Sequence, residues 1–106
     1  MKIYIDFSIF DSPTSAFGNI TGELDLAEIP VVGSKVTFEH NGLLCLSPHF
    51  MGSLRIISVQ SGKDIDGNEM PSVGLEDVVV SSRVEAADLA NKLNRELGLF
   101  IDIYDE

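Results

Sequence analysis

The sequence predicts an α+β domain: an antiparallel sheet or partly open barrel of five to seven strands, with one C-terminal helix followed by a closing strand. Two observations indicate this fold class. Hydrophobic residues alternate with polar ones in several short segments before residue 82, which is typical of half-buried strands. Beyond it, hydrophobic residues recur at spacings of three and four, the pattern of an amphipathic helix. A chain of 106 residues can bury one core, so residues 1–106 are expected to form a single domain.

The first two predicted strands are residues 2–10 and 20–29. In the segment KIYIDFSIF the odd positions are isoleucine or phenylalanine, so one face should be buried and the other exposed. Residues 11–19, DSPTSAFGN, are rich in turn formers and are expected to be the connection. The second strand alternates as well, and one of its sides should carry Ile20, Gly22, Leu24 and Leu26.

Four further strands are expected in the middle of the chain. Asn41-Gly42 is a strong hairpin signal, because a tight hairpin turn needs positive φ angles. This dipeptide separates two of the predicted strands, and two longer alternating segments follow. The four strands are expected at residues 35–40, 43–47, 53–61 and 72–81.

The helix is predicted with both of its ends. Ser82 and Glu85 stand three residues apart, as in a capping box, in which the serine oxygen accepts a hydrogen bond from an early backbone amide. Lys92 and Arg95 lie near the C-terminal end, where the helix dipole favours positive charge. Gly98 is the expected C-terminal cap, and residues 99–104 alternate again as the closing strand.

The segment KDIDGNEMP, residues 63–71, raises the question of a calcium loop. A calcium-binding loop of the EF-hand type needs ligands at positions one, three, five and twelve and a glycine at position six. A frame that begins at Asp64 puts Glu69 at position six and Leu75 at position twelve, and shifting the frame does not help. The segment is therefore predicted to be a hairpin turn around Gly67.

Three residues, His40, Cys45 and His49, could bind a metal or support thiol chemistry. A structural zinc site usually has four ligands, and a nucleophilic cysteine needs an orienting group and an oxyanion site, which the sequence does not indicate. None of the seventeen carboxylates is singled out as a catalytic pair. We therefore expect no metal, no cofactor and no enzymatic activity. The single cysteine cannot form an internal disulfide, so the cytoplasm is the expected compartment.

The charge narrows the class of partner. Seventeen acidic residues against seven basic ones give a net charge of -10, which repels nucleic acids and anionic membranes. There is no apolar run of about 20 residues that could span a bilayer. The acidity either keeps the protein soluble or attracts a cationic protein partner, and the sequence leaves both interpretations open.

One surface is predicted to bind the partner. The first and last strands carry similar outward faces, on which aromatic rings alternate with carboxylates that can anchor and attract a basic protein. The opposite faces, with Leu99, Ile101 and Ile103 in the last strand, should point to the core. Alternatively, the helix or a second copy of the chain covers the outward face. The predicted partner-binding residues are Tyr4, Asp6, Phe10, Phe100, Asp102, Tyr104, Asp105 and Glu106.

The chain also resembles a known class of proteins in its size, its acidity, its strands with one helix, and its tail LFIDIYDE. The acidic positions that carry the resemblance include Asp6, Asp25, Glu28, Asp64, Asp66, Asp102 and Asp105. In these respects it is similar to the immunity proteins of bacterial polymorphic-toxin and contact-dependent growth inhibition systems. The resemblance implies a cytoplasmic, non-catalytic inhibitor that binds and occludes a cognate basic toxin, often a nuclease.

Two alternatives remain beside this interpretation. The first is a small structural or accessory β-domain, such as a phage-encoded or assembly protein, whose acidity serves only solubility. The second is a thiol- or metal-dependent enzyme that uses His40, Cys45 and His49.

Overall fold

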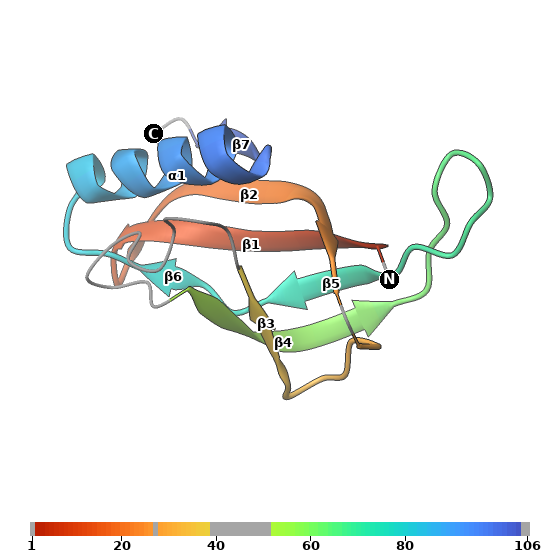
Figure 1. The fold of residues 1–106 in the computed structure, drawn as a ribbon. Coiled ribbons are helices and arrows are strands. Elements are labelled where there is room, and N and C mark those ends of the chain that lie inside the picture. Colours follow the sequence, from red (N-terminus) through yellow and green to blue (C-terminus); the bar gives the residue numbers. More distant parts are fainter. Residues whose placement is uncertain (1, 27, 39–51, 105–106) are drawn as a thin grey trace.

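The computed structural model describes residues 2–26, 28–38 and 52–104. Within these ranges the chain forms seven strands and one helix (Figure 1). Their order is β1 (Lys2–Ser12), β2 (Ser15–Asp25), β3 (Lys35–Thr37), β4 (Ser53–Gln60), β5 (Ser72–Leu75), β6 (Val78–Val79), α1 (Arg83–Leu97) and β7 (Phe100–Ile103). The predicted α+β class, with a helix followed by a closing strand, is confirmed.

The strands form one open sheet in the order β3-β4-β5-β1-β2-β7, and β6 also pairs with β1. Most neighbours are antiparallel, whereas β5 and β6 run parallel to β1. β1 therefore lies inside the sheet, with β2 on one side and β5 and β6 on the other. The sheet is not closed into a barrel, so β3 and β7 are its two edges.

The connection between the first two strands is shorter than predicted. β1 continues to Ser12 and β2 begins at Ser15, so residues 11–19 are mostly strand, and the prediction of a long connection was wrong. Gly18 was misread as a turn residue. It belongs to β2, where a Cβ would lie 2.8 Å from the carbonyl oxygen of Asp102 on β7, so the missing side chain permits this close approach.

The strands from residue 35 onward also differ in detail from the prediction. β3 ends at Thr37, and Asn41-Gly42 and the strand expected at residues 43–47 lie outside the described residues. The single strand expected at residues 72–81 is divided into β5 and β6. The division falls at Glu76 and Asp77, where the Glu76 amide donates to the carbonyl oxygen of Arg55, a residue of β4.

The helix has the ends that the sequence predicts. The Oγ of Ser82 accepts a hydrogen bond of 3.1 Å from the Glu85 amide, which satisfies one of the free amides of the first turn. Gly98 ends the helix with φ of 69°, a left-handed conformation that glycine adopts without a steric penalty. The Gly98 amide donates to the carbonyl oxygen of Asn94, 3.0 Å away.

The core lies between α1 and one face of the sheet. Leu89 and Leu93 of the helix are fully buried, as are Ile3, Ile5 and Ile9 of β1. Burial of each such side chain stabilises the fold by about 1.5–3 kcal/mol, so this face supplies most of the stability. The helix has 15 residues, and the described residues include no helix long and apolar enough to cross a bilayer.

The last strand enters the core only partly. Leu99 is buried as predicted and Ile101 is half-buried, but Ile103 is 51% exposed, so its predicted place in the core was wrong. β7 is an edge strand with a neighbour on one side only, and the covering of its residues is therefore incomplete.

Candidate functional site

The candidate site is the outer sheet face, which we define as the side of β1, β2 and β7 that points away from α1. On β1 this side carries the even-numbered residues, because the odd-numbered ones are buried in the core. It consists of Tyr4, Asp6, Ser8 and Phe10 on β1, Asn19, Thr21 and Glu23 on β2, and Phe100, Asp102 and the adjoining Tyr104 at β7.

The strand register brings residues from the two ends of the chain onto this one face. β2 lies between β1 and β7, so the two predicted strands are near one another but not adjacent. Asp6 is opposite Thr21, and Thr21 is opposite Phe100. The next row across the same strands consists of Ser8, Asn19 and Asp102. Two spacings of about 4.8 Å separate the backbones of β1 and β7, so side chains from both can contact one partner.

The aromatic residues on this face are exposed. Phe100 is 68% exposed, Tyr104 is 40% exposed and Tyr4 is 36% exposed. Most of the surface of Phe100 is exposed, so burial of its apolar area contributes little to the stability of the fold. Aromatic side chains that lose this exposure on binding are the usual anchors of protein interfaces.

The charged groups of the outer sheet face are mostly carboxylates. Lys2 lies 3.7 Å from Glu23, so that pair is locally neutral. Neither Asp6 nor Asp102 has a lysine or arginine partner among the residues that the structure describes. Between them, the Ser8 hydroxyl donates a 3.1 Å hydrogen bond to the Asn19 side chain. The centre of the face therefore offers two carboxylates that are available to a cationic group.

A shallow hollow of about 340 Å³ adjoins Tyr4 and Asp6 on the β4 and β5 side. Gly74 lines it without a side chain, and a Cβ there would clash with the hydroxyl of Ser58. An ammonium or guanidinium group in this hollow would meet the Asp6 carboxylate and several hydroxyl and amide oxygens. The hollow is lined by Tyr4, Asp6, Ser58, Gln60, Ser72, Val73 and Gly74.

Not all predicted binding residues lie together. Phe10 is on the same face, but it is half-buried and pairs with Val79 and Ala16. It is six residues from Tyr4 along β1, or about 20 Å at the rise of an extended strand. Asp105 and Glu106 lie outside the described residues.

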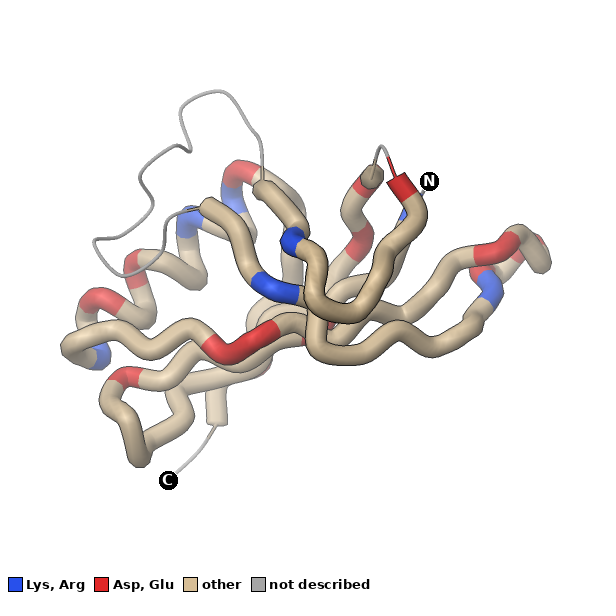
Figure 2. Tube along the Cα trace, turned by 90° about the horizontal axis from the view of Figure 1, so that it is seen from below, with Lys and Arg blue, Asp and Glu red and all other residues tan. Residues whose placement is uncertain are grey.

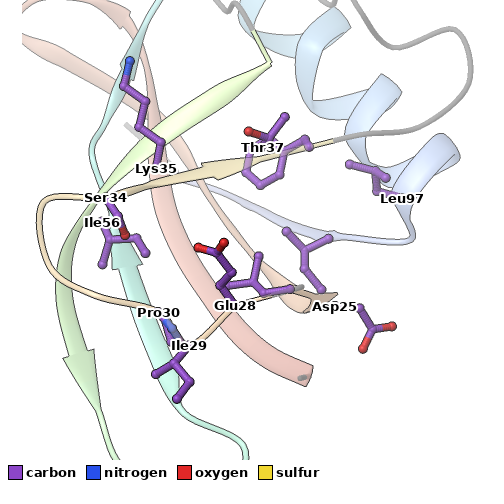
Figure 3. Close-up of a pocket in the computed structure, with 12 residues that line it drawn as sticks. Asp25, Glu28, Ile29, Pro30, Ser34, Lys35, Thr37, Ile56 and Leu97 are labelled. Carbon is purple, nitrogen blue, oxygen red and sulfur yellow. The ribbon is translucent and has the colours of Figure 1, made fainter.

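A second cavity, of about 560 Å³, was not predicted from the sequence and opens on the helix side of the sheet near the end of β2 (Figure 3). Its wall is a mixture of apolar and polar side chains, and Glu28 and Lys35 supply opposite charges (Figure 3). The side chains come from four separate parts of the chain, namely β2 with the segment after it, β3 with its flanking residues, β4 and α1, so no local pattern could have predicted the cavity. The lining residues are Leu24, Asp25, Leu26, Glu28, Ile29, Pro30, Ser34, Lys35, Thr37, Phe38, Ile56 and Leu97.

Residues 63–71, the segment KDIDGNEMP, form a hairpin turn, as predicted. The Asp64 carboxylate accepts hydrogen bonds of 2.9 Å from the amides of Asp66 and Asn68, and Gly67 has φ of 83°. The hairpin extends away from the body of the molecule (Figure 1).

The residues considered for metal or thiol chemistry, His40, Cys45 and His49, lie outside the described residues. In the described ranges, no three His, Cys, Asp or Glu side chains form a group that could hold a metal ion. The enzyme alternative therefore stays a hypothesis about residues outside those ranges.

Comparisons of the chain with protein-family models, with curated proteins and with solved structures found no match. Its function has to be inferred from its own residues and their arrangement.

Proposed function

We propose that the protein is a non-catalytic inhibitor that binds a cationic protein through the outer sheet face. The single observation that carries the proposal is the strand register, which puts Asp6, Phe100 and Asp102 on one exposed face away from the helix. These residues come from opposite ends of the chain.

Each group on the face has a distinct physical role in such a complex. Phe100, Tyr4 and Tyr104 lose exposed apolar area on contact, and buried aromatic anchors dominate the binding energy of protein interfaces. Asp6 and Asp102 pair with lysine or arginine of the partner. The net charge of -10 accelerates the encounter, because long-range attraction acts mainly on the association rate.

The partner that fits best is a basic toxin, in particular a nuclease. A nuclease holds its substrate phosphates with lysine and arginine, and carboxylates on an inhibitor can take the place of those phosphates. Occlusion then follows without any chemistry by the inhibitor. Such an inhibitor would reside in the cytoplasm of the cell that produces the toxin and protect that cell. This is the role of the immunity proteins that the chain resembles.

The test is binding to the protein encoded directly upstream, measured by surface plasmon resonance at low and high salt. We expect nanomolar affinity, or about -12 kcal/mol, with association that slows as salt is added. Asp6→Lys should weaken binding, whereas Asp88→Lys makes the same charge change on α1 and should weaken it much less. No binding, or equal effects of the two variants, would contradict the proposal.

A second function, an accessory or structural domain, is favoured by the distribution of charge. Acidic positions are spread over the helix, the turns and the projecting hairpin rather than gathered on one side (Figure 2). Such a distribution suits solubility. The two functions separate on the paired variants, because acidity that serves only solubility has no preferred position, and Asp6→Lys and Asp88→Lys should then act alike.

A further inference from the structure

We propose that the open edge of β7 binds an extended, basic segment of the partner, which adds a strand to the sheet. The charge of this segment rests on the proposed function, whereas the edge itself is a property of the fold. Among the residues that the structure describes, β7 is the last strand in the sheet order and pairs only with β2. An unpaired edge presents a row of backbone donors and acceptors that can template a further strand.

The hydrogen-bond pattern identifies the groups that face this edge. The Tyr104 amide donates to the carbonyl oxygen of Phe17 at 3.0 Å, so Tyr104 directs its backbone toward β2. In an antiparallel pair the direction alternates from one residue to the next. The backbone groups of Phe100 and Asp102 therefore also point to β2, and those of Ile101 and Ile103 point to the open edge.

The two edges of the sheet differ in how they are protected. Natural edges are usually blocked by lysine, proline, bulges or very short strands. β3, the other edge, has three residues and carries Lys35. β7 is also short, with four residues, but it has neither lysine nor proline, and its pairing with β2 has no bulge. Phe100 and Ile103 on this strand are more than half exposed, so the edge presents apolar surface on both sides of the exposed Asp102.

The side chains next to the edge define the occupant. On one side of an added strand lie Phe100 and Asp102, which suit lysine or arginine. On the other side lie Ile101 and Ile103, which suit an apolar residue. Successive side chains of a strand alternate between faces, so the fitting segment alternates basic and apolar residues. A second copy fits poorly, because it would add another Asp102 at the edge and another net charge of -10.

The first test uses a capped peptide of alternating lysine and valine, about eight residues long, which is within the usual strand length. Amide hydrogen exchange is followed by NMR at low salt. We expect exchange at Ile101 and Ile103 to slow at least about tenfold when the peptide is added, with little change at Phe100 and Asp102, which already bond to β2. The control peptides are one of the same composition with its lysines in one block, and an alternating peptide N-methylated at every second residue. Neither should slow exchange at the edge.

The second test uses variants of the intact protein with matched exposure. Ile103→Pro removes an amide that points to the open edge, which an edge strand tolerates, and should weaken peptide binding at least about tenfold. Val32→Pro replaces a similarly exposed residue in the turn before β3 and should leave binding unchanged. Circular dichroism checks that both variants fold.

The outcomes separate this inference from the proposed function. Equal binding of the N-methylated peptide, or no added protection at Ile101 and Ile103, overturns the docking of a strand. If Asp6→Lys weakens binding to the upstream-encoded protein but Ile103→Pro does not, the outer sheet face is the binding site and the edge of β7 is not. If neither variant changes binding, both proposals fail. If the protein is a dimer and Ile103→Pro converts it to a monomer, the edge of β7 binds a second copy of the chain. That result also overturns the inference.

Discussion

The two faces of β1 are built from the same nine-residue alternation but have different surroundings. Ile3 and Ile5 are fully buried under the helix, whereas Tyr4, which lies between them, is 36% exposed. Burial on one face stabilises the fold, and the other face keeps exposed aromatic rings and carboxylates that contribute little to it. The difference indicates that substitutions on the helix side should affect stability, whereas those on the outer sheet face should affect binding.

The largest loss of stability is expected from Leu93→Ala, which removes a side chain from the core between α1 and the sheet. Leu93 is fully buried on α1, and removal of a buried leucine side chain leaves a cavity that costs about 2–5 kcal/mol. Tyr4→Ala, on the opposite side of the sheet, should cost less than about 1 kcal/mol. Urea denaturation monitored by circular dichroism measures both. Similar losses would mean that the outer sheet face is structural.

Tyr104→Ala should act on the complex rather than on the fold. If Tyr104 is an anchor, its loss should raise the dissociation constant by about 30-fold, or about 2 kcal/mol, mainly through faster dissociation. Surface plasmon resonance against the upstream-encoded protein gives both rate constants. Val84→Ala is the control, because Val84 is exposed, at 80%, but lies on α1 on the other side of the sheet. An unchanged dissociation rate for Tyr104→Ala would remove it from the interface.

Asp102→Lys should act mainly on the association rate. Reversing the charge of Asp102 turns part of the long-range attraction into repulsion, so association should slow by roughly tenfold at low salt, and the effect should shrink when salt screens the field. Asp88→Lys on α1 changes the net charge by the same amount and should slow association less. If the two variants are equal, only the total charge matters and the face has no special role.

The smallest effect tests the contact between β2 and β7. A Cβ at Gly18 would lie 2.8 Å from the carbonyl oxygen of Asp102, so Gly18→Ala should push β7 away and cost about 1 kcal/mol or somewhat more. Faster amide exchange in β7, with exchange in the buried strand β1 little changed, would be the signature. Gly18→Ala that leaves β7 unchanged would show that the strand can adapt without loss.

The sequence predicted the local features of the fold and fewer of the long-range ones. The alternation around Ile3 and Ile5, the cap at Ser82 and the stop at Gly98 depend on residues close in sequence, and all are found as predicted. The position of β2 between β1 and β7 depends on pairing between distant segments, which periodicity cannot reveal. Gly18 was misread for the same reason, because its requirement comes from a strand more than 80 residues away.

For the candidate site, the sequence predicted which residues point outward but not how they meet. Tyr4, Asp6, Phe100 and Asp102 share a face because β2 holds β1 and β7 at a fixed register. The hollow beside Asp6 is formed by residues of β1, β4 and β5, and the open edge of β7 depends on the strand order. None of these three features leaves a signal in a single segment of sequence.

The most direct test of the binding role is a map of the interface on the protein itself. Isotope-labelled protein is titrated with the upstream-encoded protein at low salt, and backbone amide shifts are followed by NMR. We predict that the changes gather on residues 4–8 of β1, 19–23 of β2 and 100–104 at β7, while α1 is little affected. Changes that gather on α1 or around the cavity near Glu28, or an absence of binding, would contradict the account.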